Sequence, residues 1–70
     1  MDEKEILEMI DKEFWSYYKY KSEEPSVILI SEENYSILLI GFEDKEARLS
    51  YKNATIFGTK QIENNEAKLF

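Results

Sequence analysis

The sequence predicts a small α+β domain in which an N-terminal amphipathic helix packs on a short sheet, with the element order α-β-α-β-β. Three observations support this fold class. Apolar residues recur at helical spacing at the start of the chain, a proline and a compact apolar run follow, and the last third alternates apolar and polar residues between polar turns. At 70 residues, we expect a single compact domain over residues 1–70, near the lower size limit for independent folding.

Residues 2–21 are predicted to form the amphipathic helix. Acidic residues crowd its start and Lys19 and Lys21 stand at its end, so that both signs of charge match the helix dipole. Pro25 ends the segment, because proline disfavours helical geometry in the residue before it. The apolar positions fall within about a third of the helical circumference; they are Ile6, Leu7, Ile10, Phe14, Tyr17 and Tyr18.

Residues 27–30, with the sequence VILI, are predicted to form a short strand that is buried on both faces. Ser31 then provides a hydroxyl for a helix N-cap, and the acidic residues that follow it suit the first helical turn. Apolar side chains at 35, 38, 39 and 42 have the spacing of one helix face. Gly41 is expected to end this helix in a left-handed conformation.

A competing interpretation of the same stretch places a hairpin loop at residues 31–34 and a second strand at residues 35–42. A continuous apolar run does not by itself separate a strand from a helix. If residues 35–42 belong to a helix, the predicted sheet has three strands, and if they form a strand, it has four. We take the helix as the main prediction.

The remaining residues are predicted to complete the sheet. Residues 43–46 form a charged connector. Residues 47–51 are a candidate for a short strand that the order α-β-α-β-β does not count, and Lys52 and Asn53 make a tight turn in which asparagine tolerates positive φ. A strand at 54–61 follows, with Ile56 on one face and Phe57 on the other.

Gly58, within that strand, marks a bulge or the close approach of another segment. A polar turn at residues 63–65 leads to a terminal strand at 67–70. If the strands 27–30 and 54–61 are neighbours, the intervening helix is their right-handed crossover, and the last strand closes the sheet as a hairpin.

The helix, then PSVILISEENYSIL, then ATIFGTKQIENNEAKLF, together resemble the later part of the peripheral domain of tailed-bacteriophage major capsid proteins. In that family a proline and an apolar strand lead into a short helix, and a strand with an internal glycine, a polar turn and a closing strand follow. The resemblance covers residues 6–70 and lacks the rest of a capsid subunit, so it implies a phage setting or a capsid-like surface. The matching positions are Pro25, residues 27–30, Ser31, Tyr35, Leu38, Gly58, Ile62 and Ala67.

The chemical inventory argues against catalysis and against a bound cofactor. The chain has no histidine and no cysteine, so the commonest general base and the best nucleophile are absent. The acidic run at residues 43–46 lacks the alternating ligands and the glycine of a calcium loop, and we expect no metal site. The sequence therefore predicts a protein that is not an enzyme.

The charge balance indicates the kind of partner. Fifteen acidic residues against nine basic ones give a net charge of -6, which opposes binding to nucleic-acid phosphates or anionic lipid and favours a larger protein with a basic or apolar surface. No apolar run approaches the roughly 18 residues that span a bilayer, and the start does not resemble a signal peptide. We expect a cytoplasmic location and no membrane partner.

Trp15 is the strongest candidate for partner binding. It falls outside the apolar stripe of its helix, beside Tyr18 and Asp11 and two turns from Glu8, so the indole is either a lid on the core or an exposed interface anchor. The sequence predicts a small acidic non-enzymatic protein-binding module that binds through these four residues. With the phage setting that the resemblance implies, the module would be a phage-encoded inhibitor or modulator of a host protein. The alternative is a structural or virion-associated assembly protein that acts as a homo-oligomer, for example a homodimer.

Overall fold

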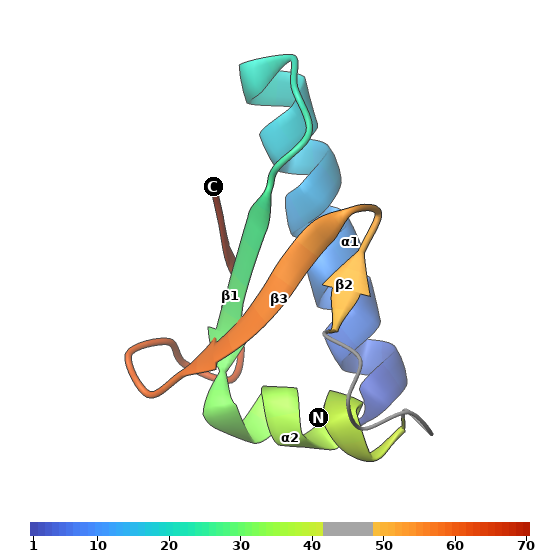
Figure 1. Ribbon diagram of the computed structural model, residues 1–70, viewed down its shortest axis with the longest axis vertical. Coiled ribbons are helices and arrows are strands. Elements are labelled where there is room, and N and C mark those ends of the chain that lie inside the picture. The colour runs from blue at the N-terminus through green and yellow to red at the C-terminus, as the bar shows by residue number, and fades with distance from the viewer. Residues whose placement is uncertain (42–48) are drawn as a thin grey trace.

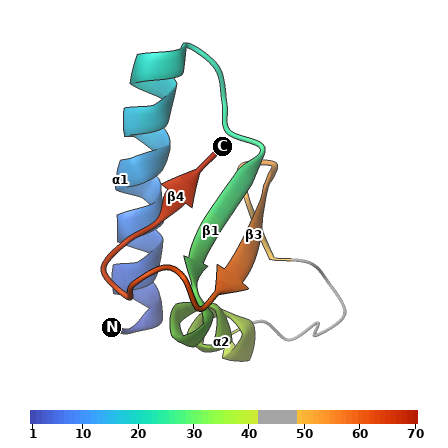
Figure 2. The ribbon, with the colours of Figure 1, turned by 90° about the vertical axis from the view of Figure 1, so that its left-hand side faces the viewer.

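Helix α1 (Glu3–Lys21) lies along one face of a four-stranded mixed sheet in the computed structural model of the chain (Figures 1 and 2). The structure describes residues 1–41 and 49–70. Helix α2 (Glu32–Ile40) lies across one end of the sheet, where β1 finishes (Figure 1). The α+β class and the N-terminal helix packed on a sheet are confirmed. The predicted connector 43–46, Phe42 and the start of the predicted strand 47–51 lie outside the described residues.

The sheet has the strand order β2-β3-β1-β4. Strand β1 (Val27–Ser31) pairs in parallel with β3 (Ala54–Thr59) and antiparallel with β4 (Lys68–Leu69), while β2 (Ser50–Tyr51) pairs antiparallel with β3. The strands that begin at Val27 and Ala54 are therefore neighbours in the sheet, which is the condition under which the sequence made α2 their crossover. Over the described residues the element order is α-β-α-β-β-β, with one strand more than the main prediction counted. The additional strand is β2, which lies within the candidate strand 47–51.

The last strand does not close the sheet as a hairpin with β3, as predicted, but pairs with β1 on its other side. Ile28 is opposite Leu69 in this pairing. Beyond it, the Phe70 N–H donates to the Val27 carbonyl at 2.9 Å, and the Val27 N–H donates to the Phe70 carbonyl at 3.0 Å. Strand β1 thus pairs with β3 along one edge and with β4, at the end of the chain, along the other. The second edge of β3 pairs with β2.

Helix α1 begins and ends with local hydrogen bonds that its sequence provides. Asp2 is the N-cap: the Glu5 N–H donates to Asp2 Oδ1 at 2.9 Å, and the Glu5 carboxylate accepts from the Asp2 N–H at 3.4 Å, which completes a capping box. Ser22 adopts φ 57 and ends the helix before Pro25. The predicted helix is confirmed, but its buried stripe is narrower than predicted, with Ile6, Ile10 and Phe14 buried and Leu7, Tyr17 and Tyr18 partly exposed.

Residues 32–40 are a helix, so the interpretation of residues 35–42 as a strand is wrong over the described part of that range. Ser31 is the N-cap as predicted, because its Oγ accepts a hydrogen bond from the Asn34 N–H at 3.0 Å. The prediction for Gly41 is wrong. Gly41 has φ -73 and ψ -10, and its N–H still bonds to the Leu38 carbonyl at 3.1 Å, so the helix ends without a left-handed residue.

Strand β1 is buried on one face only, which corrects the prediction of burial on both. Ile28 and Ile30 are fully buried, whereas Val27 and Leu29 are half-buried. Successive side chains of a strand point to opposite faces, and α1 covers one face, as Figure 2 shows. The side facing α1 holds the core, which consists of Ile6, Ile10, Ile28, Ile30, Leu38, Leu49, Ala54 and Ile56.

Two backbone predictions in the second half of the chain are confirmed. Lys52 and Asn53 form the tight turn between β2 and β3 with φ 47 and 72, a left-handed pair of the kind that two-residue hairpin turns use. Gly58 marks a close approach, because a Cβ atom there would lie 2.7 Å from the Cβ of Tyr35 in α2. Ile56 is buried and Phe57 exposed, as their opposite faces require. No helix in residues 1–41 or 49–70 is long and apolar enough to cross a bilayer.

Candidate functional site

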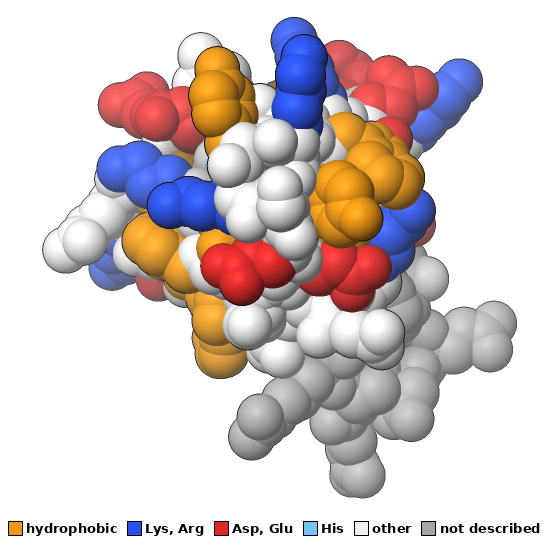
Figure 3. Space-filling model, turned by 90° about the horizontal axis from the view of Figure 1, so that it is seen from above, with side chains coloured by type: hydrophobic (Ala, Val, Ile, Leu, Met, Phe, Trp, Pro, Cys, Tyr) orange, Lys and Arg blue, Asp and Glu red, His pale blue; other side chains and the backbone are white. Residues whose placement is uncertain are grey.

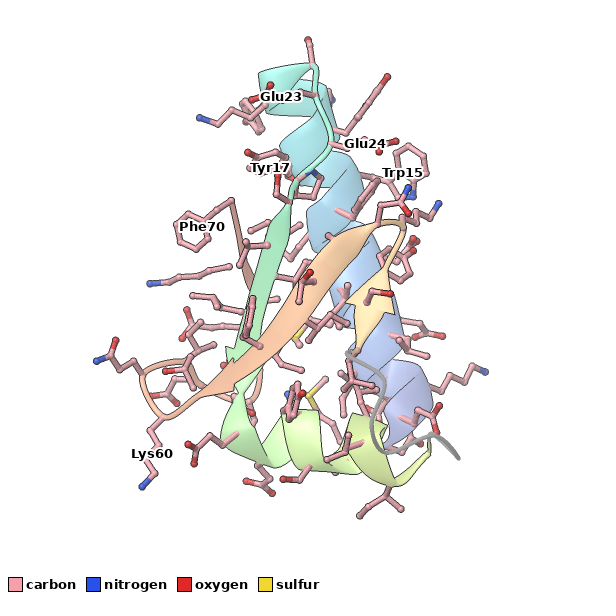
Figure 4. The ribbon with its side chains drawn as sticks, in the orientation of Figure 1. Trp15, Tyr17, Glu23, Glu24, Lys60 and Phe70 are labelled. Atoms are coloured by element: carbon pink, nitrogen blue, oxygen red, sulfur yellow. The ribbon has the colours of Figure 1, made fainter. Side chains whose placement is uncertain are left out.

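Trp15 is a half-exposed aromatic residue that is held in place by neighbouring rings. Its side chain is 51% exposed. The indole makes edge-to-face contacts with Phe14, at a centroid distance of 5.5 Å, and with Tyr18, at 6.0 Å. Figure 4 shows Trp15 projecting from α1 beside the turn that joins β2 to β3. The indole therefore packs partly on the core and still presents a large apolar surface, which combines the two roles that the sequence left open.

Lys52 reaches back from that turn over the aromatic residues of α1 and β2. Its Nζ lies 4.6 Å from the centroid of the Trp15 ring, 5.5 Å from that of Phe14 and 5.7 Å from that of Tyr51. The rings of Phe14 and Tyr51 are themselves in edge-to-face contact at 5.6 Å. One ammonium group thus lies among three aromatic rings from two elements. We call Phe14, Trp15 and Tyr51 the aromatic cluster.

Asp11 fixes the outer end of this cluster. The Tyr51 hydroxyl donates a hydrogen bond to Asp11 Oδ1. Burial raises the pKa of Tyr51 from 10.0 to about 12, and the hydrogen bond and the negative charge of Asp11 act in the same direction. Tyr51 is therefore neutral at physiological pH, with a fixed hydrogen-bond direction.

An acidic groove continues from Asp11 toward the amino end of α1. Its volume is about 760 Å³. Four carboxylates and one lysine line it together with two apolar or aromatic side chains: Asp2, Glu3, Glu8, Asp11, Lys4, Leu7 and Tyr51. Such an excess of carboxylates attracts cationic groups and repels phosphates.

The structure brings the four residues predicted as a binding site onto one side of α1. Trp15 contacts Tyr18, Asp11 bonds to Tyr51 in the same cluster, and Glu8 lies in the acidic groove with Asp11. In the view of Figure 3, hydrophobic side chains gather on the side where Figure 4 places Trp15, with charged side chains around them. The spacing 8, 11, 15 and 18 explains this arrangement, because residues three and four apart share one helix face.

Sequence reasoning missed three members of the site. Phe14 was predicted only as part of the apolar stripe of its helix; its side chain is 1% exposed, and its ring also contacts the indole of Trp15. Tyr51 and Lys52 come from the β2–β3 hairpin, far along the chain. The predicted turn at Lys52 and Asn53 was the available signal, but helical periodicity does not reveal which side of α1 the turn would face.

The described ranges 1–41 and 49–70 contain no group of three or more acidic, histidine or cysteine side chains placed to hold a metal ion. Comparisons of this chain with protein-family models, with curated proteins and with solved structures find no match. The geometry and charge of the site itself are therefore what indicate a function for this chain.

Proposed function

We propose that this chain is a small acidic, non-enzymatic protein-binding module whose Trp15 face docks on a larger protein with a basic or apolar surface. The observation that carries the proposal is the state of Trp15, which is 51% exposed and yet held by Phe14, Tyr18 and Lys52. Aromatic residues that are already ordered lose little entropy on binding, and tryptophan is frequent among the residues that dominate interface energies.

The charges around Trp15 support a basic partner surface. Asp11 lies beside the aromatic cluster and Glu8 in the adjoining groove. Complementary charges of this kind speed the encounter of two proteins and disfavour unsuitable partners. The net charge of -6 acts in the same direction and disfavours nucleic acid and anionic membranes as direct partners.

The setting that we propose follows from the resemblance to the peripheral domain of tailed-phage capsid proteins. We place the module in a phage context, as an inhibitor or modulator of a host protein in the cytoplasm. Such a role needs only a stable surface that blocks or redirects another protein, which is consistent with a chain without histidine or cysteine.

The second candidate function is self-assembly through the outer face of the sheet. Leu29 is the register partner of both Phe57 and Lys68, so these side chains share the face turned away from α1. Phe57 is 46% exposed there. An apolar sheet face of this kind can pack on a second copy, which would make the protein a homo-oligomeric structural or virion-associated component.

The test is a comparison of the protein with its Trp15→Ala variant. The partner is first captured from extract of the native host and then titrated in purified form. We expect Trp15→Ala to weaken the complex by about 2 kcal/mol or more, roughly 30-fold in Kd, with the thermal unfolding curve nearly unchanged. Tyr20→Ala is the matched control, because Tyr20 is an aromatic residue of α1 that is 85% exposed and lines a different groove with Tyr17 and Phe70.

Charge removal provides an independent check. Glu8→Gln and Asp11→Asn should act mainly on the association rate, and their effects should shrink as the salt concentration rises. A Trp15→Ala variant that unfolds would place the indole in the core and refute this docking face. A purified chain that is dimeric by light scattering, and whose dimer is broken by Phe57→Ser rather than by Trp15→Ala, would favour self-assembly.

A further inference from the structure

The aromatic cluster has the composition and geometry of a binding site for an organic ammonium ion. Phe14, Trp15 and Tyr51 all lie within 5.7 Å of one nitrogen, measured from ring centroid to Lys52 Nζ. Cations are attracted to the negative faces of aromatic rings, and groups of aromatic side chains recognise quaternary ammonium ligands and methylated lysine in this way. In the free protein, the ammonium group of Lys52 itself occupies this position.

The walls of this site are fixed, whereas its occupant is an exposed side chain. Phe14 is 1% exposed and belongs to the buried side of α1. Tyr51 is held by its hydrogen bond to Asp11. Lys52 is exposed at the tip of the β2–β3 turn, and a lysine side chain rotates about several bonds. Trp15 is held by its edge-to-face contacts with Phe14 and Tyr18. None of these contacts involves Lys52, so we expect the rings to keep their positions when its ammonium group leaves.

The surrounding charges favour a cation rather than a neutral or anionic ligand. The Asp11 carboxylate lies at the hydroxyl end of Tyr51, and Glu8 lines the adjoining groove. Because the Tyr51 hydroxyl points to Asp11, it remains protonated and the ring stays neutral. The site thus offers aromatic faces inside and negative charge at its border.

We propose that Phe14, Trp15 and Tyr51 form an ammonium-binding site that Lys52 fills in the free protein and that a lysine side chain of the partner occupies in the complex. This inference rests on the proposed function, since it names the group by which a basic partner is recognised at the same face. In the free chain Lys52 competes with the partner, so its removal should strengthen binding of any ammonium ligand.

Trp15 is the only tryptophan of the chain, so its fluorescence reports directly on the site. The experiment is a titration of the protein and of Lys52→Ala with tetramethylammonium chloride, in which sodium chloride is replaced mole for mole to keep the ionic strength constant. We expect a saturable change of tryptophan fluorescence in Lys52→Ala with an affinity about fivefold or more above that of the unaltered protein, because the competing side chain is gone.

Lys60→Ala is the matched control. Lys60 is an exposed lysine that also follows a strand of the hairpin, and Figure 4 shows it at the opposite corner of the molecule from Trp15. It should titrate like the unaltered protein. If Lys52→Ala fails to fold, Lys52→Met keeps the length of the side chain without its charge and takes its place. Equal titration curves for the Lys52 and Lys60 variants would overturn the proposal, as would tighter binding of guanidinium than of tetramethylammonium.

The outcome separates this inference from the proposed function. If Lys52→Ala shows no gain for tetramethylammonium while Trp15→Ala still weakens the partner complex, the ammonium site is wrong and the docking face stands. If Lys52→Ala binds the probe more tightly but Trp15→Ala leaves the partner complex unchanged, the ammonium site stands, but its occupation by a lysine of the partner is wrong because the partner docks elsewhere.

Discussion

The side chain of Tyr35 in α2 lies directly against the backbone of Gly58 in β3. A Cβ atom at position 58 would lie 2.7 Å from the Tyr35 Cβ and 2.9 Å from its Cγ, and 3.3 Å from the Cα of Glu32. Gly58→Ala should therefore push α2 away from the end of the sheet and lower the free energy of unfolding by about 1–3 kcal/mol. Urea denaturation followed by circular dichroism measures this change.

Gly41→Ala is the control for that substitution. A Cβ at position 41 would meet the carboxylate of Glu3, the far end of an exposed side chain that is free to turn aside. Gly41 has φ -73, which alanine adopts readily, so we expect unchanged stability or a gain of about 0.4–1 kcal/mol. A Gly58→Ala variant as stable as Gly41→Ala would show that the contact with Tyr35 is not tight.

Asn34 connects the start of α2 to the polar turn before β4. Its side chain is 1% exposed, and its Nδ2 donates to the Asn64 carbonyl at 2.7 Å. Asn34→Ala leaves that carbonyl without this donor and should cost about 1–3 kcal/mol. The neighbouring cap substitution Ser31→Ala should cost about 1 kcal/mol, because the Asn34 N–H loses its acceptor.

Ser36→Ala serves as the control for both variants of α2. Ser36 is exposed inside the same helix, where alanine is the better helix former, so its replacement should not destabilise the protein. Thermal melts of the three variants measured together test the prediction. Equal melting temperatures for Asn34→Ala and Ser36→Ala would contradict the role given to the Asn34 side chain.

The two faces of β1 should respond differently to truncation. Ile30 is fully buried on the α1 side, and Ile30→Ala should cost about 2–5 kcal/mol through lost contacts and a cavity. Leu29 is half-buried on the outer face, so Leu29→Ala should cost clearly less. Chemical denaturation compares the two. A larger loss at Leu29 would mean that the outer face is covered in solution, for instance by a second copy.

The pKa of Tyr51 implies a loss of stability at alkaline pH. Its value is raised from 10.0 to about 12 in the folded protein by burial, by the hydrogen bond to Asp11 and by the Asp11 charge. Between these two pH values the unfolded chain has released the tyrosine proton and the folded chain still holds it, so unfolding is favoured as pH rises. The contribution of this group is complete below pH 10 and is lost progressively up to about pH 12.

The measurement is the melting temperature from pH 8 to pH 12 for the protein and for Tyr51→Phe. Tyr51→Phe should show a weaker decline above pH 10, since phenylalanine has no proton to lose. Parallel curves for the two proteins would show that Tyr51 titrates normally. Tyr20→Phe is the control, because Tyr20 is 85% exposed.

Local patterns allowed most of the elements to be predicted. Helical spacing and acidic capping residues identify α1, and Ser31 followed by acids identifies the junction of β1 and α2. The same patterns do not show which strands pair with one another. The alternation at residues 67–70 indicates a strand, but alternation sets which side chains share a face and not which strand lies alongside, so the pairing of β4 with β1 was not foreseen.

Burial and the full binding site depend in the same way on contacts between distant residues. All four residues of the run VILI are apolar, so the sequence does not show which of them are buried. Only Ile28 and Ile30 face α1. Asn34 is polar yet buried, and the carbonyl that accepts its hydrogen bond belongs to Asn64 in another part of the chain. Helix geometry places Trp15 beside Asp11, whereas the approach of Lys52 requires the hairpin to fold against α1.

The central position of β1 has a consequence for the growing chain. Both of its neighbours, β3 and β4, follow it in the sequence. A ribosome therefore completes β1, with its apolar residues 27–30, while both hydrogen-bonding edges of that strand still lack their partners. Such an edge is a template for pairing with other chains. In the finished sheet the outermost strands, β2 and β4, have only two residues each, so aggregation threatens the nascent protein more than the folded one.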